Sequence, residues 1–257
     1  MRDKLLVETA VLAGEIMLVS GAEIYRVEDT ITRILKKAEN KSADTVATVT
    51  GIFTTLNDTK TEEITTVRRI VRRATNLNRI YLVNNVSRKL CADAITVEDA
   101  YEELLHIKEA VLYGTWKKNL AIVGVAVFFT MLLGGSVWDC TLSAFTGVCL
   151  MAATILSRKA RLNDFCSNAF GAFVIAMAAM LLEFAGFSFH RDLVITATIM
   201  PLVPGVIFTT AIRDTLNGDY AAGVARMLEA AVIALAVAAG VGCGMAVFNW
   251  IAGGIGL

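Results

Sequence analysis

The sequence predicts a mainly α-helical integral membrane protein, with a cytoplasmic α+β domain over residues 1–118 and a transmembrane domain of five helices over residues 119–257. The charge distribution is the first reason: residues 1–118 hold 18 of the 24 Lys/Arg and 17 of the 24 Asp/Glu. The other 139 residues hold the remaining 13 charges. About a quarter of the residues of a globular domain are charged, so the second part is too apolar for a soluble domain of its size.

Five apolar stretches in the second part are the other reason. A helix rises about 1.5 Å per residue, so about 20 apolar residues are needed to cross a hydrocarbon core of about 30 Å. Backbone polar groups in lipid need internal partners, so these stretches should be helical. The expected spans are 119–137, 140–157, 166–189, 193–212 and 227–251.

The Lys and Arg residues beside these spans predict the orientation, because cytoplasmic loops carry an excess of positive charge. One side holds seven of them: Lys117, Lys118, Arg158, Lys159, Arg161, Arg213 and Arg226. The opposite side holds Arg191. We therefore expect a multi-pass protein of the inner (plasma) membrane with its N-terminus in the cytoplasm and its C-terminus outside. Glu8 and Glu15 interrupt the apolar N-terminal stretch, so we expect no signal peptide.

Several local patterns predict the elements of the cytoplasmic domain. The first 40 or so residues are typical of helix, and Ser20 with Glu23 has the spacing of a capping box that opens a new helix. Thr96 with Asp99 is a second such pair, and a further helix is expected over Asn78–Leu90. Residues 44–56 are rich in Thr and Val, contain Gly51 and precede an Asn-Asp pair, which favours a β-hairpin.

A dense basic patch follows the hairpin, formed by Arg68, Arg69, Arg72 and Arg73. It could contact anionic membrane lipid, or it could be a solvated face paired with Glu62 and Glu63. No nucleic-acid-binding motif or aromatic platform accompanies it, so we expect no nucleic acid partner.

The fourth span contains the two prolines of the chain, Pro201 and Pro204, followed by Gly205. Proline removes a backbone donor and frees carbonyl groups, and broken helices at membrane depth are found where they are buried or line a cavity. Transporters use such breaks to bind substrates or ions. The nearby hydroxyls of Thr198 and Thr209 could contribute, although a plain proline kink that serves packing is the alternative.

Ionisable residues near the spans give further candidates for substrate binding or ion coupling. Glu229 is expected about one turn into the fifth span, where a buried charge usually serves function. A loop at the cytoplasmic ends of spans four and five supplies Arg213, Asp214, Asn217 and Asp219. A carboxylate could carry a proton and Arg213 could meet a substrate carboxylate, or these residues could be ordinary turn and interface residues.

No catalytic or cofactor-binding pattern is present in the sequence. His106 and His190 are the only histidines and are expected on opposite sides of the membrane, which excludes a histidine-based triad or metal site. Phosphate loops and dinucleotide fingerprints are absent. We therefore expect no enzyme, no metal and no cofactor.

Motifs along nearly the whole chain resemble the threonine/serine exporter family, and in particular the larger subunit of its split, two-component form. The motifs are Gly21–Glu28, Thr50–Phe53, Asn76–Arg79, Asn84–Arg88, Pro201–Gly205, Arg213–Gly223 and the span around Glu229. The resemblance implies export of small metabolites across the inner membrane, driven by the proton-motive force. The substrate it implies is either threonine and serine or a succinate-like dicarboxylate.

The resemblance also implies a partner. Fused members of the family carry further spans in the same chain, so this chain is expected to form a hetero-oligomer with a smaller membrane subunit. The helical motif with Glu23, Tyr25, Arg26 and Glu28 could gate the cytoplasmic entrance, or Glu23 and Arg26 could form a local ion pair. The alternative function is a membrane-anchored sensor or scaffold whose cytoplasmic domain binds a partner protein.

Overall fold

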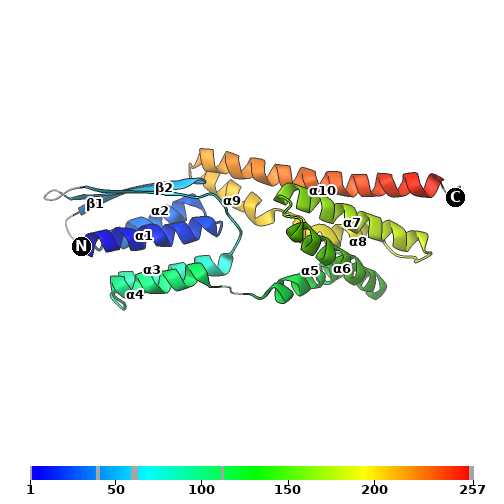
Figure 1. The fold of residues 1–257 in the computed structure, drawn as a ribbon, viewed down its shortest axis with the longest axis horizontal. Coiled ribbons are helices and arrows are strands. Elements are labelled where there is room, and N and C mark those ends of the chain that lie inside the picture. Colours follow the sequence, from blue (N-terminus) through cyan, green and yellow to red (C-terminus); the bar gives the residue numbers. More distant parts are fainter. Residues whose placement is uncertain (1, 39–40, 59–62, 111–112, 255–257) are drawn as a thin grey trace. The chain divides into compact units, whose positions relative to one another are not determined.

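The computed structural model describes residues 2–38, 41–58, 63–110 and 113–254 (Figure 1). The chain packs into two compact units, each built from two separate segments. Unit 1 comprises Met1–Val111 and Gly205–Leu228, and unit 2 comprises Leu112–Pro204 and Glu229–Leu257. The described chain is mainly helical, with one small sheet, and this confirms the predicted fold class.

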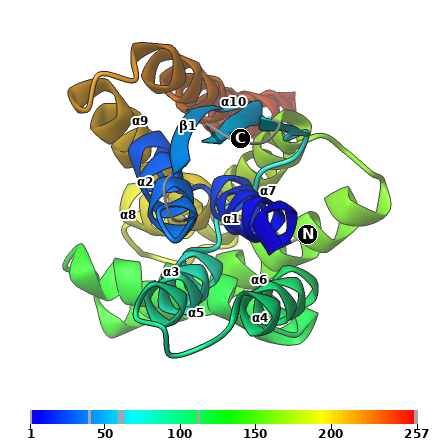
Figure 2. The ribbon, with the colours of Figure 1, turned by 90° about the vertical axis from the view of Figure 1, so that its left-hand side faces the viewer.

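Unit 1 is layered, as Figure 2 shows. A sheet packs on the helices α1 and α2, which pack in turn on α3 and α4. Helix α9 and the first turns of helix α10 complete the unit. The bounds are α1 Arg2–Val19, α2 Ile24–Leu35, β1 Lys41–Thr48, β2 Gly51–Asp58, β3 Ile64–Arg69, α3 Leu77–Cys91, α4 Val97–Glu109, α9 Gly205–Leu216 and α10 Tyr220–Gly254.

Helix α1 is the centre of this unit. It contacts α2, α3 and α4 as well as the strands β2 and β3. Apolar residues occur on all sides of the helix, and most of its side chains are buried. A helix that is apolar all round is a core helix, which explains why this stretch resembles a short membrane segment in sequence.

The predicted sheet is larger than a hairpin. Strands β1 and β2 pair antiparallel and β3 pairs with the other edge of β2. On β2, Ile52, Thr54 and Leu56 face the helices and are buried, whereas Phe53 is exposed. Arg68 and Arg69 lie at the end of β3. The suggested partner Glu62 lies outside the described residues.

Two of the expected helix starts are confirmed and one is wrong. Thr96 and Asp99 form the predicted capping box of α4, and α3 contains the predicted helix over Asn78–Leu90. Ser20 does not cap α2: the N-cap is Glu23, whose side chain makes no capping hydrogen bond.

The Ser20–Gly21 pair ends α1 instead of opening α2. Gly21 has a φ of 86°, in the left-handed region that glycine adopts without strain. The N–H of Gly21 donates to the carbonyl of Leu18, and that of Ala22 donates to Met17 at 3.0 Å. These bonds satisfy the last carbonyls of α1, as a glycine at a helix C-terminus commonly allows.

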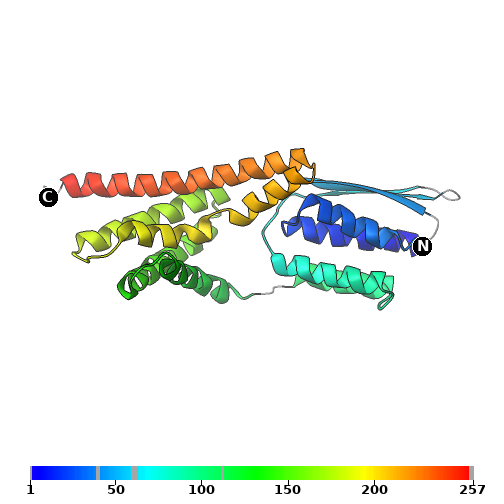
Figure 3. The ribbon, with the colours of Figure 1, turned by 180° about the vertical axis from the view of Figure 1, so that it is seen from behind.

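Unit 2 contains α5 Thr115–Leu132, α6 Val137–Lys159, α7 Asp164–Phe184, α8 Arg191–Ile199, the 3₁₀ helix η1 Met200–Leu202 and the rest of α10. Figure 3 shows α7 running beside α10. Here Gly240 and Gly244 allow the backbone of α10 to approach α7 closely. Gly240 and Gly244 therefore serve the packing of α10 on α7.

Within the described residues, four helices are long and apolar enough to cross a membrane: α5, α6, α7 and α10. The pair Arg191–Leu202 and Gly205–Leu216 counts as a fifth span if the two parts are taken together. The predicted break at the prolines is thus present in the helix over the expected fourth span. Helix α10 begins at Tyr220 rather than near 227, and a short turn joins it to α9 (Figure 3).

Candidate functional site

The turn between α1 and α2 is held by buried polar groups of α9 and α10. The backbone N–H of Ile24 donates to Oδ1 of Asp214 at 2.9 Å. Arg226 donates to the carbonyl of Ala22 at 2.7 Å, and its Nε lies 3.3 Å from Oδ2 of Asp214. Asp214 and Arg226 are both buried, so this ion pair fastens α2 to the α9–α10 hairpin and is closed to a solute.

Glu23 lies beside this ion pair and links two arginines. Its Oε1 accepts from Nη1 of Arg213 at 2.7 Å and its Oε2 from Nη1 of Arg26 at 3.2 Å. The side chain of Glu23 is only 7% exposed. Burial alone raises the pKa of this carboxyl, but a backbone hydrogen bond and the two guanidinium groups outweigh burial and hold the pKa below its usual value. Glu23 is therefore a charged acceptor at neutral pH.

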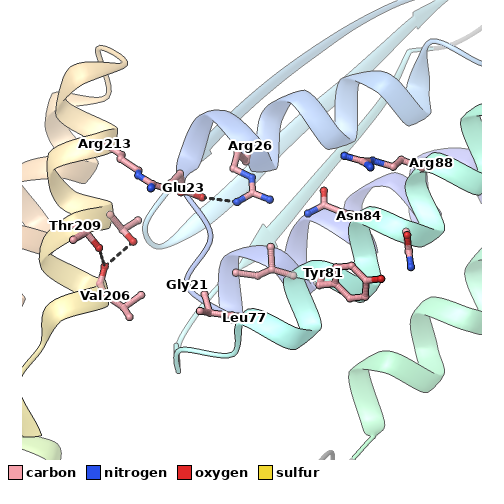
Figure 4. A pocket seen from close by; sticks show the side chains of 13 residues that line it. Gly21, Glu23, Arg26, Leu77, Tyr81, Asn84, Arg88, Val206, Thr209 and Arg213 are labelled. Atoms are coloured by element: carbon pink, nitrogen blue, oxygen red, sulfur yellow. Dashed lines mark hydrogen bonds and ion pairs between the residues drawn. The ribbon is translucent and has the colours of Figure 1, made fainter. Parts of the chain in front are cut away.

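A cavity of about 570 Å³ opens at this cluster, between α2, α3 and α9 (Figure 4). We call it the arginine pocket. Its charged lining residues are Glu23, Arg26, Arg88 and Arg213, and its neutral polar ones are Tyr81, Asn84, Asn85, Thr209 and Thr210. The volume lies in the range of small-molecule sites, which is about 300–1,000 Å³.

The charge balance of the arginine pocket is positive, with three arginines against one glutamate. Figure 4 shows Arg26 on α2 with Asn84 and Arg88 on α3 pointing into the same space. The side chain of Arg88 has no hydrogen-bond or ion-pair partner within the described parts of the chain. Because a guanidinium group binds a carboxylate through two parallel hydrogen bonds, the pocket is suited to a small carboxylate-bearing solute.

Four of the residues predicted from sequence meet in this pocket. Thr209 and Arg213 come from the loop and span candidates, and Glu23 and Arg26 come from the suggested gate motif. The local Glu23–Arg26 ion pair is present, and Arg213 extends it to a second helix.

The pocket residues on α3 are not among the site residues predicted from the sequence. Asn84, Asn85 and Arg88 recur at helical spacing on the exposed part of α3, and this polar strip was the available signal.

Other predicted residues of unit 1 lie outside the pocket lining. Tyr25 is exposed. Oε1 of Glu28 accepts from the N–H of Ala47 at 2.7 Å, which joins α2 to β1. Asn217 donates to the carbonyl of Arg213 at 2.7 Å and so closes the end of α9. Asp219 lies in the α9–α10 turn, and its negative charge raises the pKa of the Glu28 carboxyl.

The residues predicted around the proline break lie in a different environment. Thr198 is buried, 2.8 Å from the hydroxyl of Thr146, and donates to the carbonyl of Val194. Pro201 lies in η1. Pro204 lines a second cavity of about 560 Å³ between α8 and α10, whose walls are almost entirely apolar.

Gly205 and Glu229 complete the predicted set. Gly205 begins α9, and Glu229 is half-buried on α10. Neither residue lines either cavity. A role for the break and for Glu229 in ion coupling stays a prediction.

Comparison with known proteins gives a consistent result. A family model described as "Putative threonine/serine exporter" matches residues 8–248. A "Probable threonine/serine exporter" of Mycobacterium tuberculosis is 23% identical over 230 residues, which cover 89% of this chain and 43% of that protein. The "Threonine/serine exporter" of Corynebacterium glutamicum is 26% identical over 78% of this chain and 42% of its own length.

A second kind of relative is of similar length. The "Probable succinate transporter subunit YjjP" of Escherichia coli is 24% identical over 237 residues, which cover 89% of both chains. This chain thus spans less than half of the two exporters and most of the transporter subunit. No solved structure matches it significantly. The family match covers nearly the entire chain and agrees with its membrane helices, so the chain belongs to the threonine/serine exporter family.

Proposed function

We propose that this protein is a subunit of a secondary exporter that moves small carboxylate-bearing metabolites across the inner membrane, and that the arginine pocket receives them. One observation carries the proposal: three arginines and several amides and hydroxyls line a cavity with a single carboxylate. A membrane-anchored scaffold has no need of a cationic cavity of this size. Membership of an exporter family supports the same function.

The positive charges that flank the spans support a proposal for the side of the membrane on which the pocket opens. Unit 1 carries the N-terminal domain, and seven of the eight Lys/Arg near the span ends are expected on that side. We therefore propose that the pocket faces the cytoplasm and is where the solute enters. Export would then begin with capture of a cytoplasmic metabolite.

The charge of the pocket favours a dicarboxylate over an amino acid. A zwitterionic amino acid has no net charge, so it would leave the two excess positive charges of the described pocket lining unbalanced. A dicarboxylate would balance the two excess positive charges. The name of the YjjP relatives agrees with this choice, whereas threonine or serine, named for the longer relatives, is the second candidate.

A partner subunit and the energy source complete the proposal. The YjjP relatives are named as transporter subunits, which supports a transporter of several subunits, and we propose that the partner is a smaller membrane protein. The sequence has no phosphate loop, so we propose that the proton-motive force drives export.

The pocket is tested in a strain that lacks the gene for this protein and carries a wild-type or variant copy of it, by measuring how fast the cells export the solute. Arg88→Gln removes a pocket charge that has no protein partner among the described residues, so the fold should tolerate it. A charge-assisted hydrogen bond contributes about 1.5–3 kcal/mol, so efflux of labelled succinate should fall by about tenfold or more at low internal succinate. The matched control is Arg33→Gln, since Arg33 pairs with Asp29 on the exposed side of α2.

Membrane levels of each variant are measured by immunoblot. Wild-type efflux from Arg88→Gln at equal protein level would contradict the assignment of the pocket. If Arg88→Gln lost threonine efflux but kept succinate efflux unchanged, the result would support threonine or serine as the substrate instead.

A further inference from the structure

We propose that Glu23 is a built-in competitor of the transported anion: its carboxylate holds Arg26 and Arg213 in the empty arginine pocket, and a bound solute carboxylate displaces it. This inference rests on the proposed function, because it assumes that the pocket binds anions, and it adds how the affinity of that site is set.

The geometry of Glu23 resembles that of a bound ligand. One oxygen of its carboxylate accepts from Arg213 on α9 and the other from Arg26 on its own helix, at 2.7 and 3.2 Å. Both arginines line the cavity. A solute carboxylate that entered the cavity would seek the same two guanidinium groups, because these are the donors with the right charge and planar geometry.

The arginines can change partner without loss of the fold. Each guanidinium group has five N–H donors, and within the described chain only one of these on Arg26 and one on Arg213 is used, each by Glu23. The Arg26 side chain is 35% exposed and the Arg213 side chain 63%, so both have room to turn.

The fold is held elsewhere, by separate buried bonds. Asp214 caps Ile24, and Arg226 binds the carbonyl of Ala22. These bonds keep α2 against α9 and α10 while Glu23 is released.

Competition of this kind lowers the apparent affinity of the pocket. A solute that binds only when Glu23 has moved binds more weakly, in proportion to the fraction of molecules in that state. The Glu23 charge also repels an anion directly. For an exporter this has a use, because Glu23 can take the arginines back and so help the solute to leave the pocket.

Titration of succinate into the purified full chain in detergent micelles, followed by isothermal calorimetry, tests the proposal. Glu23→Gln keeps the size and an oxygen acceptor but removes the charge, so succinate should bind about tenfold more tightly than to the wild type. Arg88→Gln should weaken binding about tenfold. Asp29→Asn removes an exposed carboxylate of the same helix that also pairs with an arginine, and should change nothing.

Thermal unfolding shows whether each variant is folded. If Glu23→Gln is not, Glu23→Asp replaces it: the shorter side chain reaches the two guanidinium groups less well, so binding should tighten about threefold.

Each result distinguishes this inference from the proposed function. In one outcome, a folded Glu23 variant binds succinate no more tightly than the wild type, while Arg88→Gln binds it more weakly. That pair of results would overturn the role of Glu23 but still support an anion-binding pocket. No succinate binding by wild type and Glu23→Gln alike would overturn both.

Discussion

The carboxylate of Asp214 caps the N-terminus of α2 from 190 residues away, by accepting the backbone N–H of Ile24 at 2.9 Å. A helix start leaves N–H groups without partners, and a nearby Ser, Thr, Asp or Asn usually accepts one of them. Here the side chain comes from α9. Helix α2 therefore depends on the α9–α10 hairpin for the cap of its N-terminus.

The first prediction concerns this buried cap. In Asp214→Ala, Arg226 loses its carboxylate partner in a buried site, and removal of one member of such a pair costs about 3–5 kcal/mol of unfolding free energy. Unfolding of the detergent-solubilised protein in denaturant measures the change. Asp29→Asn, on the exposed face of α2, is the control and should lie within about 0.5 kcal/mol of the wild type.

A double variant separates the charge from the cap. Asp214→Leu with Arg226→Met removes both charges of the pair, so it should be more stable than Asp214→Ala although the cap of Ile24 is still missing. Equal stability of the two would show that keeping the Arg226 charge without Asp214 costs nothing.

The second prediction is a pH dependence at Glu28. Burial raises the pKa of this carboxyl, and the negative charge of Asp219 raises it further, against the lowering effect of the hydrogen bond from Ala47. The folded state thus binds the proton more tightly than the unfolded state. The stability that this tighter proton binding contributes is fully present below the pKa of Glu28 in the unfolded state, near 4.5. It is lost as the pH rises through the pKa of Glu28 in the folded state.

Glu28→Gln tests this sign. Glutamine keeps an oxygen for Ala47 without the charge, so the variant should melt at a higher temperature than the wild type at pH 7, and the difference should shrink toward pH 5. A difference that grows as the pH falls would contradict the prediction. Asp29→Asn, one residue away and exposed, should show no such trend.

The third prediction concerns the packing of α10 on α7. A methyl group at Gly240 would collide with the carbonyl oxygen of Ala169 and lie 2.9 Å from Cβ of Ala172. Gly240→Ala should therefore destabilise the protein by about 1–3 kcal/mol. Gly242→Ala is the matched control two residues along the same helix, because a methyl group there meets nothing within 4 Å. Equal thermal stability of the two variants would disprove the close approach.

The fourth prediction distinguishes structure from transport at Thr198. Its hydroxyl lies 2.8 Å from that of Thr146 and also bonds the carbonyl of Val194, in a buried position. Hydrogen bonds between membrane helices contribute about 0.6 kcal/mol on average, so Thr198→Val should lose roughly that much stability and keep most of the proposed succinate export. If Thr198→Val were stable but exported no succinate, the prediction would be contradicted and Thr198 would be a candidate substrate contact.

Local patterns explain what could be predicted from sequence. The Thr96–Asp99 cap and the helices around it depend on neighbours three or four residues apart, so the sequence contains all that is needed. The same reasoning failed at Ser20, because Gly21 and the last turn of α1 use that segment to end a helix and the cap of α2 comes from Asp214.

The candidate site was predicted in pieces. Arg213 and Thr209 were assigned to the span region and Glu23 and Arg26 to a separate gate, and no pattern in the sequence joins the two groups. Their meeting depends on α9 packing with the N-terminal helices. The α3 residues Asn84 and Arg88 gain a role only once this cavity exists.

The sequence by itself determined the membrane-spanning character, because a long apolar helix cannot remain in water whatever surrounds it. The proline break is equally local, since proline lacks the N–H that a helix needs. Only the tertiary structure decided which polar side chains share a cavity. The Glu23–Arg213 ion pair and the Asp214–Ile24 cap join groups 190 residues apart, and contacts at that separation are set by how whole helices pack rather than by any local preference.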